Sequence, residues 1–106
     1  MNFIMSHNFD SESKRWEIVL NGEIDIFNSM EFKNQLLGLL TQNPGSLVLD
    51  CDKLEYIDST ALGALVTVLK HVKSADGQMY LKKIRPNLAK LFKITSLDKV
   101  FIIEGV

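Results

Sequence analysis

Three residues with oxygen-bearing side chains, Asp58-Ser59-Thr60, stand between an apolar run and a helical pattern. A hydroxyl at the start of a helix lies beside backbone N–H groups that have no intrahelical partner, in a positive local potential. A phosphate group fits such a position without refolding the domain, and its charge of about −1.5 to −2 changes the surface sharply. Aspartate, serine and threonine are also favoured N-caps, so a purely structural capping role explains these residues too.

The surroundings of this helix start favour a functional site. The preceding run, Leu47–Cys51, is typical of a buried parallel strand, and loops at the carboxyl ends of such strands commonly carry function. Opposite the apolar stripe, the helix carries small uncharged residues where a solvated face is usually rich in lysine and glutamate. Gly63 costs the helix about 1 kcal/mol relative to alanine, which close packing against a partner, or within the fold, would explain. The small face consists of Ser59 or Thr60, Gly63, Ala64 and Thr67.

A hairpin and a loop precede the first predicted helix. Phe3–Phe9 and Trp16–Leu20 have strand-like patterns on either side of a polar turn, which predicts an antiparallel pair. Asn21-Gly22 interrupts the second strand, and Glu23–Phe27 follows as a loop that carries Asp25.

Three helices are predicted from start and stop signals and from apolar spacing. Asn28 is suited to cap the first helix, with Glu31 completing a variant capping box, and Asn43-Pro44-Gly45 ends it. The second helix begins at Ser59, and Pro86 suits the first turn of the third. The predicted buried residues are Phe32, Leu36, Leu39 and Leu40, then Leu62, Leu65, Val66, Leu69 and Val72, and finally Leu88, Leu91 and Phe92.

Strands alternate with helices from Trp16 onward, through a strand at Gln78–Lys82 and a last short strand at Val100–Ile103. This order predicts a single α/β domain over residues 1–106, a length that suits one core. We expect a mixed, mostly parallel sheet of four to five strands, with an N-terminal antiparallel hairpin and about three helices.

The composition argues against several classes of function. The net charge is −1, from 12 basic and 13 acidic residues, and the lysines are scattered, so we expect no nucleic-acid binding. The longest apolar stretch, Ala61–Leu69, falls short of the roughly 20 residues of a membrane span, and the N-terminus has no signal-peptide pattern. We therefore expect a cytoplasmic protein without direct membrane contact. Cys51, the single cysteine, is interpreted as a small buried residue.

Catalysis by Ser59 would need a general base, and the histidines are His7 and His71. His71 lies about 18 Å along the helix by its rise, and His7 lies on the predicted edge strand, so we assign no catalytic residue and expect no enzyme. A receiver-like Mg²⁺ site is an alternative, but nothing in the sequence makes the acidic residues converge, and we expect no metal or cofactor. The acids considered are Asp25, Asp50, Asp52, Glu55 and Asp58.

Several blocks of the sequence resemble the STAS-domain anti-sigma factor antagonists of bacteria. Leu47–Asp50 followed by Tyr56–Gly63 resembles their strand and Asp-Ser block, and Asn21–Asp25 resembles their Gly-Glu-hydrophobic-Asp loop. Asn87–Leu97 is similar to their third helix and the turn after it. The matches span nearly the whole chain in the right order. Ala61 departs from the glycine of many members, and many members continue into a further helix after the last strand.

The resemblance implies a partner switch centred on Ser59, which aligns with a serine phosphorylated by a serine kinase that is itself the anti-sigma factor. Unphosphorylated antagonist binds this kinase and releases a sigma factor, whereas phosphorylation breaks the complex. A phosphatase would reset Ser59, and Thr60 is a weaker acceptor or a cap. We expect altered partner affinity with an unchanged fold, and a monomer or weak dimer. The expected partner-binding residues are Asp25, Asn28, Asp58, Thr60, Gly63, Ala64 and Thr67.

STAS domains also occur in other assemblies, which leaves an alternative role open. The alternative is a subunit of another assembly, either of stressosome type or a lipid-trafficking complex. A transporter tail is disfavoured because the chain has no predicted membrane segment.

Overall fold

The computed structural model describes residues 3–105, which form one five-stranded sheet and three α-helices. In chain order the elements are β1 (Phe3–Asp10), β2 (Arg15–Ile24), α1 (Ser29–Gln42), β3 (Ser46–Ile57), α2 (Ser59–Ser74), β4 (Met79–Ile84), α3 (Pro86–Ile94), the 3-10 turn η1 (Leu97–Lys99) and β5 (Ile102–Gly105). The strand order is β1-β2-β3-β4-β5. The predicted α/β class and its N-terminal hairpin are confirmed.

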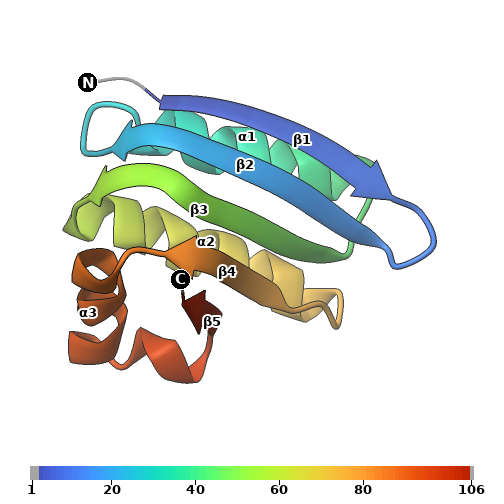
Figure 1. The fold of residues 1–106 in the computed structure, drawn as a ribbon. Coiled ribbons are helices and arrows are strands. Elements are labelled where there is room, and N and C mark those ends of the chain that lie inside the picture. Colours follow the sequence, from blue (N-terminus) through green and yellow to red (C-terminus); the bar gives the residue numbers. More distant parts are fainter. Residues whose placement is uncertain (1–2, 106) are drawn as a thin grey trace.

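The sheet is mixed, and its helices gather on one side. β1 pairs antiparallel with β2, and the three remaining strand pairs are parallel. α1 and α2 lie side by side and cover one face of the sheet (Figure 1). Crossovers between parallel strands are almost always right-handed, so connections that all step across the sheet in the same direction place their helices on one side of it. Within residues 3–105 no helix covers the opposite face, and α3 lies beyond β4, next to β5 (Figure 1).

The core lies between the sheet and the helices α1 and α2. Alternate residues of β2 and β3 point into it, as the register pair Trp16 and Leu47 illustrates. The predicted buried residues of the helices are confirmed except for Val66 and Leu91, which are half-buried. Val68 is fully buried outside the predicted stripe, because α2 packs against both β3 and α1 and so buries a wider face.

Two strands, β2 and β3, extend four or more residues beyond their predicted ends. β2 continues through Asn21-Gly22, where a break is predicted: Gly22 adopts a φ of 112°, and the register with β3 shifts on either side of this pair. β3 continues to Ile57, beyond the predicted strand Leu47–Cys51. Its continuation is stabilised because Leu54 and Ile57 are buried. As a consequence, β2 and β3 end side by side.

The last strand begins two residues later than predicted. β5 starts at Ile102, because the chain first forms η1 and then buries Phe101. The Phe101 ring packs edge-on against the ring of Phe92, with 5.5 Å between the centroids. This contact holds the end of the sheet against α3.

Candidate functional site

The candidate site forms at the end of the sheet where β2 and β3 stop together. Ile24 pairs with Ile57, so the residues that follow them, Asp25 and Asp58, leave the sheet at the same place. Ser59 then begins α2. The register of β2 and β3 therefore brings the predicted Asp25 loop to the start of the helix that carries Ser59.

Asp58 connects the helix to this loop through its two carboxylate oxygens. The Ala61 N–H donates to Oδ1 over 2.9 Å, which makes Asp58 the side-chain N-cap of α2. The Ile26 N–H donates to Oδ2 over 3.0 Å. A single side chain thus satisfies one free donor of the helix and fixes the position of the loop.

The loop between β2 and α1 is fixed by further hydrogen bonds from its own side chains. Asp25 Oδ1 accepts from the N–H groups of Phe27 (2.9 Å) and Asn28 (3.3 Å). Asn28 Oδ1 accepts from the Asp25 N–H, and its amide donates to the Glu23 carbonyl oxygen, each over 2.9 Å. These contacts give the loop one defined backbone conformation.

The predicted capping box of α1 does not form. Asn28 is the N-cap residue by position, but its side chain makes no capping hydrogen bond because it is engaged with Asp25 and Glu23. Glu31 lies in the first turn, where its charge favours the helix, and it accepts a hydrogen bond from Gln35.

The predicted site residues differ widely in exposure. Ser59, Thr60 and Gly63 are exposed, whereas Asp58 and Thr67 are half-buried. The remaining three, Asp25, Asn28 and Ala64, are buried. Asp25 is only 3% exposed, and its Oδ2 atom has no hydrogen-bond partner within residues 3–105. Asp25 and Asn28 are therefore placed to shape the loop rather than to present a polar surface.

The small residues of α2 line a shallow groove between α1 and α2. Thr60, Gly63, Ala64 and Thr67 form one side of it, and Ser29, Met30 and Lys33 form the other. A Cβ atom added at Gly63 would meet no heavy atom within 4 Å. Close packing within the fold therefore does not account for this glycine.

Three exposed apolar residues beside the site were not among the predicted site residues. Ile26 is 65% exposed, Phe27 91% and Met30 68%, and we call these three residues the apolar loop patch. A signal was present in the sequence, since Ile-Phe is an unusual pair within a polar loop. Its exposure depends on the tertiary position of the loop, which the sequence pattern alone does not give.

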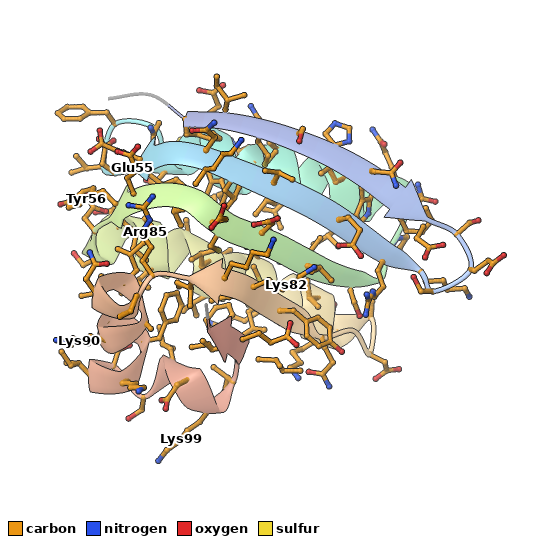
Figure 2. The ribbon with its side chains drawn as sticks, in the orientation of Figure 1. Glu55, Tyr56, Lys82, Arg85, Lys90 and Lys99 are labelled. Atoms are coloured by element: carbon orange, nitrogen blue, oxygen red, sulfur yellow. The ribbon has the colours of Figure 1, made fainter. Side chains whose placement is uncertain are left out.

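Acidic residues gather in the loop beside the start of α2. The segment 23–31 contains the acids Glu23, Asp25 and Glu31 and no basic residue. Figure 2 shows Glu55 and Tyr56 on β3, near the end of the strand from which the chain enters α2. Lys82, Lys90 and Lys99 lie farther away, on β4, α3 and η1. Arg85 instead reaches β3, where its Nη2 donates to the Asp52 carbonyl oxygen over 3.5 Å, and it lies beside Glu55 and Tyr56 (Figure 2).

The other chemistry-bearing residues lie away from Ser59. His71 is exposed one turn from the end of α2, where its Nδ1 lies 3.1 Å from the Thr67 carbonyl oxygen. His7 lies on β1 and packs edge-on against Trp16, with 5.6 Å between the centroids. Burial raises the pKa of the Cys51 thiol to about 12, and the Asp50 carboxylate contributes to the increase.

Two wider features are absent from the part of the chain that the structure describes. Among residues 3–105, no three histidine, cysteine or acidic side chains come together as metal ligands. No helix over the same residues has the length and apolar character needed to cross a membrane.

Comparisons with known proteins place this geometry in one family. A STAS-domain family model matches residues 16–105. The chain is 32% identical over 103 residues to the anti-sigma-B factor antagonist of Bacillus subtilis, a match that covers 95% of this chain and 94% of that protein.

Solved structures share the fold. A Thermotoga maritima chain assigned to the anti-sigma factor antagonists matches with a TM-score of 0.87 and 23% identity, covering 96% of this chain and 86% of that one. The phosphorylated form of the Bacillus cell fate determinant SpoIIAA matches with a TM-score of 0.74 and 16% identity, covering 96% and 92%.

Proposed function

The chain belongs to the STAS-domain family of anti-sigma factor antagonists, and we therefore propose that it works as a partner switch controlled at Ser59. In its unphosphorylated form it binds a serine kinase that is also an anti-sigma factor, and this binding releases a sigma factor. Phosphorylation of Ser59 by that kinase ends the complex.

The observation that carries this proposal is the position of Ser59. Its side chain is exposed as the first residue of α2, and no hydrogen bond within residues 3–105 involves its hydroxyl. Asp58 already accepts from the Ala61 N–H, and the N–H groups of Ser59 and Thr60 come before the helix's own hydrogen bonds begin. A phosphate on Ser59 would therefore meet free donors and the positive end of the helix dipole.

A phosphate on Ser59 would change both the charge and the size of a side chain within the proposed docking surface. A phosphate adds about −1.5 to −2 charge to a site that already holds the carboxylates of Asp58 and Asp25. Lys33 is the single cation among the residues that line the neighbouring groove. Because Ser59 is exposed at a helix end, the added charge alters the docking surface without disturbing the core.

The proposal extends to the setting in which the switch operates. A phosphatase resets Ser59, and the chain acts in the cytoplasm as a monomer or weak dimer. It performs no catalysis itself, which the remoteness of His71, twelve positions along the chain from Ser59, supports. A related fold solved in a phosphorylated form, that of SpoIIAA, is compatible with this mode of control.

Incubation with the purified anti-sigma factor kinase of the source organism and ATP, followed by mass-spectrometric mapping, tests the proposal. We expect one phosphate on Ser59, none in Ser59→Ala, and an unchanged yield in Thr60→Ala. Phosphate on another residue, or none, would contradict the assignment. A chain that binds no kinase but copurifies with a membrane transport complex would support the role in a lipid-trafficking assembly.

A further inference from the structure

The apolar loop patch, Ile26, Phe27 and Met30, has no role in the core of this domain. All three side chains are largely exposed, and Phe27 is the most exposed of the large apolar residues described. A small domain that leaves an aromatic ring and two aliphatic chains together in water usually does so for an interaction. Their exposure is therefore a feature to be explained by a partner.

The backbone beneath the patch is held rigidly. The Ile26 N–H donates to Asp58, and the Phe27 N–H donates to Asp25. Both acceptors are carboxylates, which form stronger hydrogen bonds than neutral acceptors. Binding of a partner to this loop therefore costs little conformational entropy, as is typical of aromatic anchor residues at interfaces.

The patch is continuous with the switch serine. Asp58, which fixes Ile26, directly precedes Ser59. Met30 also lines the groove that contains Thr60 and Gly63. The apolar loop patch, Ser59 and this groove therefore form one connected surface.

The charge around the patch defines the chemistry of its partner. Glu23 and Glu31 flank the patch along the chain, and the segment 23–31 has no basic residue. Two cations lie farther from Phe27: Arg85 beside Glu55 at the end of β3 (Figure 2), and Lys33 in the groove that Met30 lines. A complementary partner surface is apolar at its centre and basic at its rim.

We propose that Phe27, flanked by Ile26 and Met30, is the anchor that inserts into an apolar pocket with a basic rim on the kinase/anti-sigma factor. This inference rests on the proposed function, because it identifies where and how the same partner is held. Asp25 and Asp58 act as positioning residues that present Phe27 to that pocket.

Binding to the purified anti-sigma factor kinase of the source organism, without ATP, tests this assignment. Phe27→Ala should raise the dissociation constant at least about tenfold, as expected for an aromatic anchor. The matched control is Ile94→Ala, which removes a side chain that is 79% exposed on α3, away from the site, and should leave binding within about twofold. Both variants should keep the thermal midpoint, because neither residue packs in the core.

Association rates test the basic rim separately. Glu31→Lys should slow association and weaken its dependence on salt, whereas Asp98→Lys, on η1, should change neither. Equal binding by Phe27→Ala and the wild type would overturn the anchor while leaving the partner switch intact. A wild-type chain that binds no kinase would overturn both.

Discussion

The carboxylate of Asp58 accepts a hydrogen bond from the backbone N–H of Ile26 over 3.0 Å, across 32 residues of sequence. Asp58, which precedes Ser59, thus fixes the position of Ile26, which precedes the exposed Phe27. Since the other oxygen of Asp58 caps α2, the helix start and the loop are positioned by one side chain. This link joins Ser59 and the apolar loop patch in the one surface that we propose binds the kinase.

Replacing Asp58 should weaken both the helix and the loop. Asp58→Ala removes two hydrogen bonds, and we expect the free energy of unfolding to fall by about 1–3 kcal/mol. Asp58→Asn keeps one acceptor oxygen, so its free energy of unfolding should fall by less. Urea denaturation measures both, with Asp52→Ala, whose side chain is exposed, as the control. Hydrogen exchange at the Ile26 N–H should accelerate in Asp58→Ala; unchanged exchange and stability would show that the link has no energetic role.

Two helical glycines with space for a side chain, Gly63 and Gly38, allow effects on helix stability to be separated from effects on kinase binding. A Cβ atom added at Gly63 or at Gly38 meets no heavy atom within 4 Å, so alanine at either position should stabilise its helix by about 0.5–1 kcal/mol. Gly38 lies on α1 and lines no part of the groove beside Ser59. Gly63→Ala should therefore weaken kinase binding and Gly38→Ala should not. Equal affinities for the two variants would remove the groove from the docking surface.

Much of the fold follows from local patterns, whereas the end of the sheet does not. Phe32 and Leu36 are buried as predicted, because helical spacing fixes a face whatever lies opposite it. Lys53 and Glu55 are polar and typical of a loop, yet they belong to β3. Their strand conformation depends on Leu54, whose burial follows from the register with β2.

The difference between local patterns and tertiary contacts also explains which parts of the site the sequence predicts. Neighbouring residues predict both the Asp58-Ser59 cap and the loop that carries Asp25, and the family resemblance adds the link of this loop to Ser59. The role of Asn28 differed from the prediction because tertiary acceptors and donors outcompeted its local capping contact. Phe27 was missed because nothing within the loop specifies that its ring faces water.

Cys51 should make the stability of the domain depend on alkaline pH. Burial raises the pKa of this thiol from 9.0 to about 12, so above pH 9 the unfolded chain loses the proton before the native chain does. This favours unfolding, and stability should be unaffected by the thiol below pH 9 and fall between pH 9 and 12. The pH dependence of urea denaturation, compared with Cys51→Ala, isolates this contribution. A disulfide-exchange reagent should label native Cys51 at pH 8 far more slowly than the unfolded chain; rapid native labelling would contradict the burial.

A fixed negative charge at the switch position should imitate phosphorylation in part. Ser59→Asp should weaken kinase binding, because it puts a larger, charged side chain beside Asp58 at a position that the docked partner would cover, and removing that carboxylate from water is costly. Its thermal midpoint should stay nearly unchanged, since an acidic residue in the first turn favours the helix by about 0.3–1 kcal/mol. Calorimetry and binding measured on the same preparation check both expectations. Weakened binding that came with a large loss of stability would indicate damage to the fold.

The most direct test measures the affinity of one preparation for the purified anti-sigma factor kinase before and after stoichiometric phosphorylation of Ser59. We expect the unphosphorylated chain to bind and the phosphorylated chain to bind at least about tenfold more weakly, with Ser59→Ala remaining bound after incubation with ATP. Equal affinities of the two forms would contradict the account.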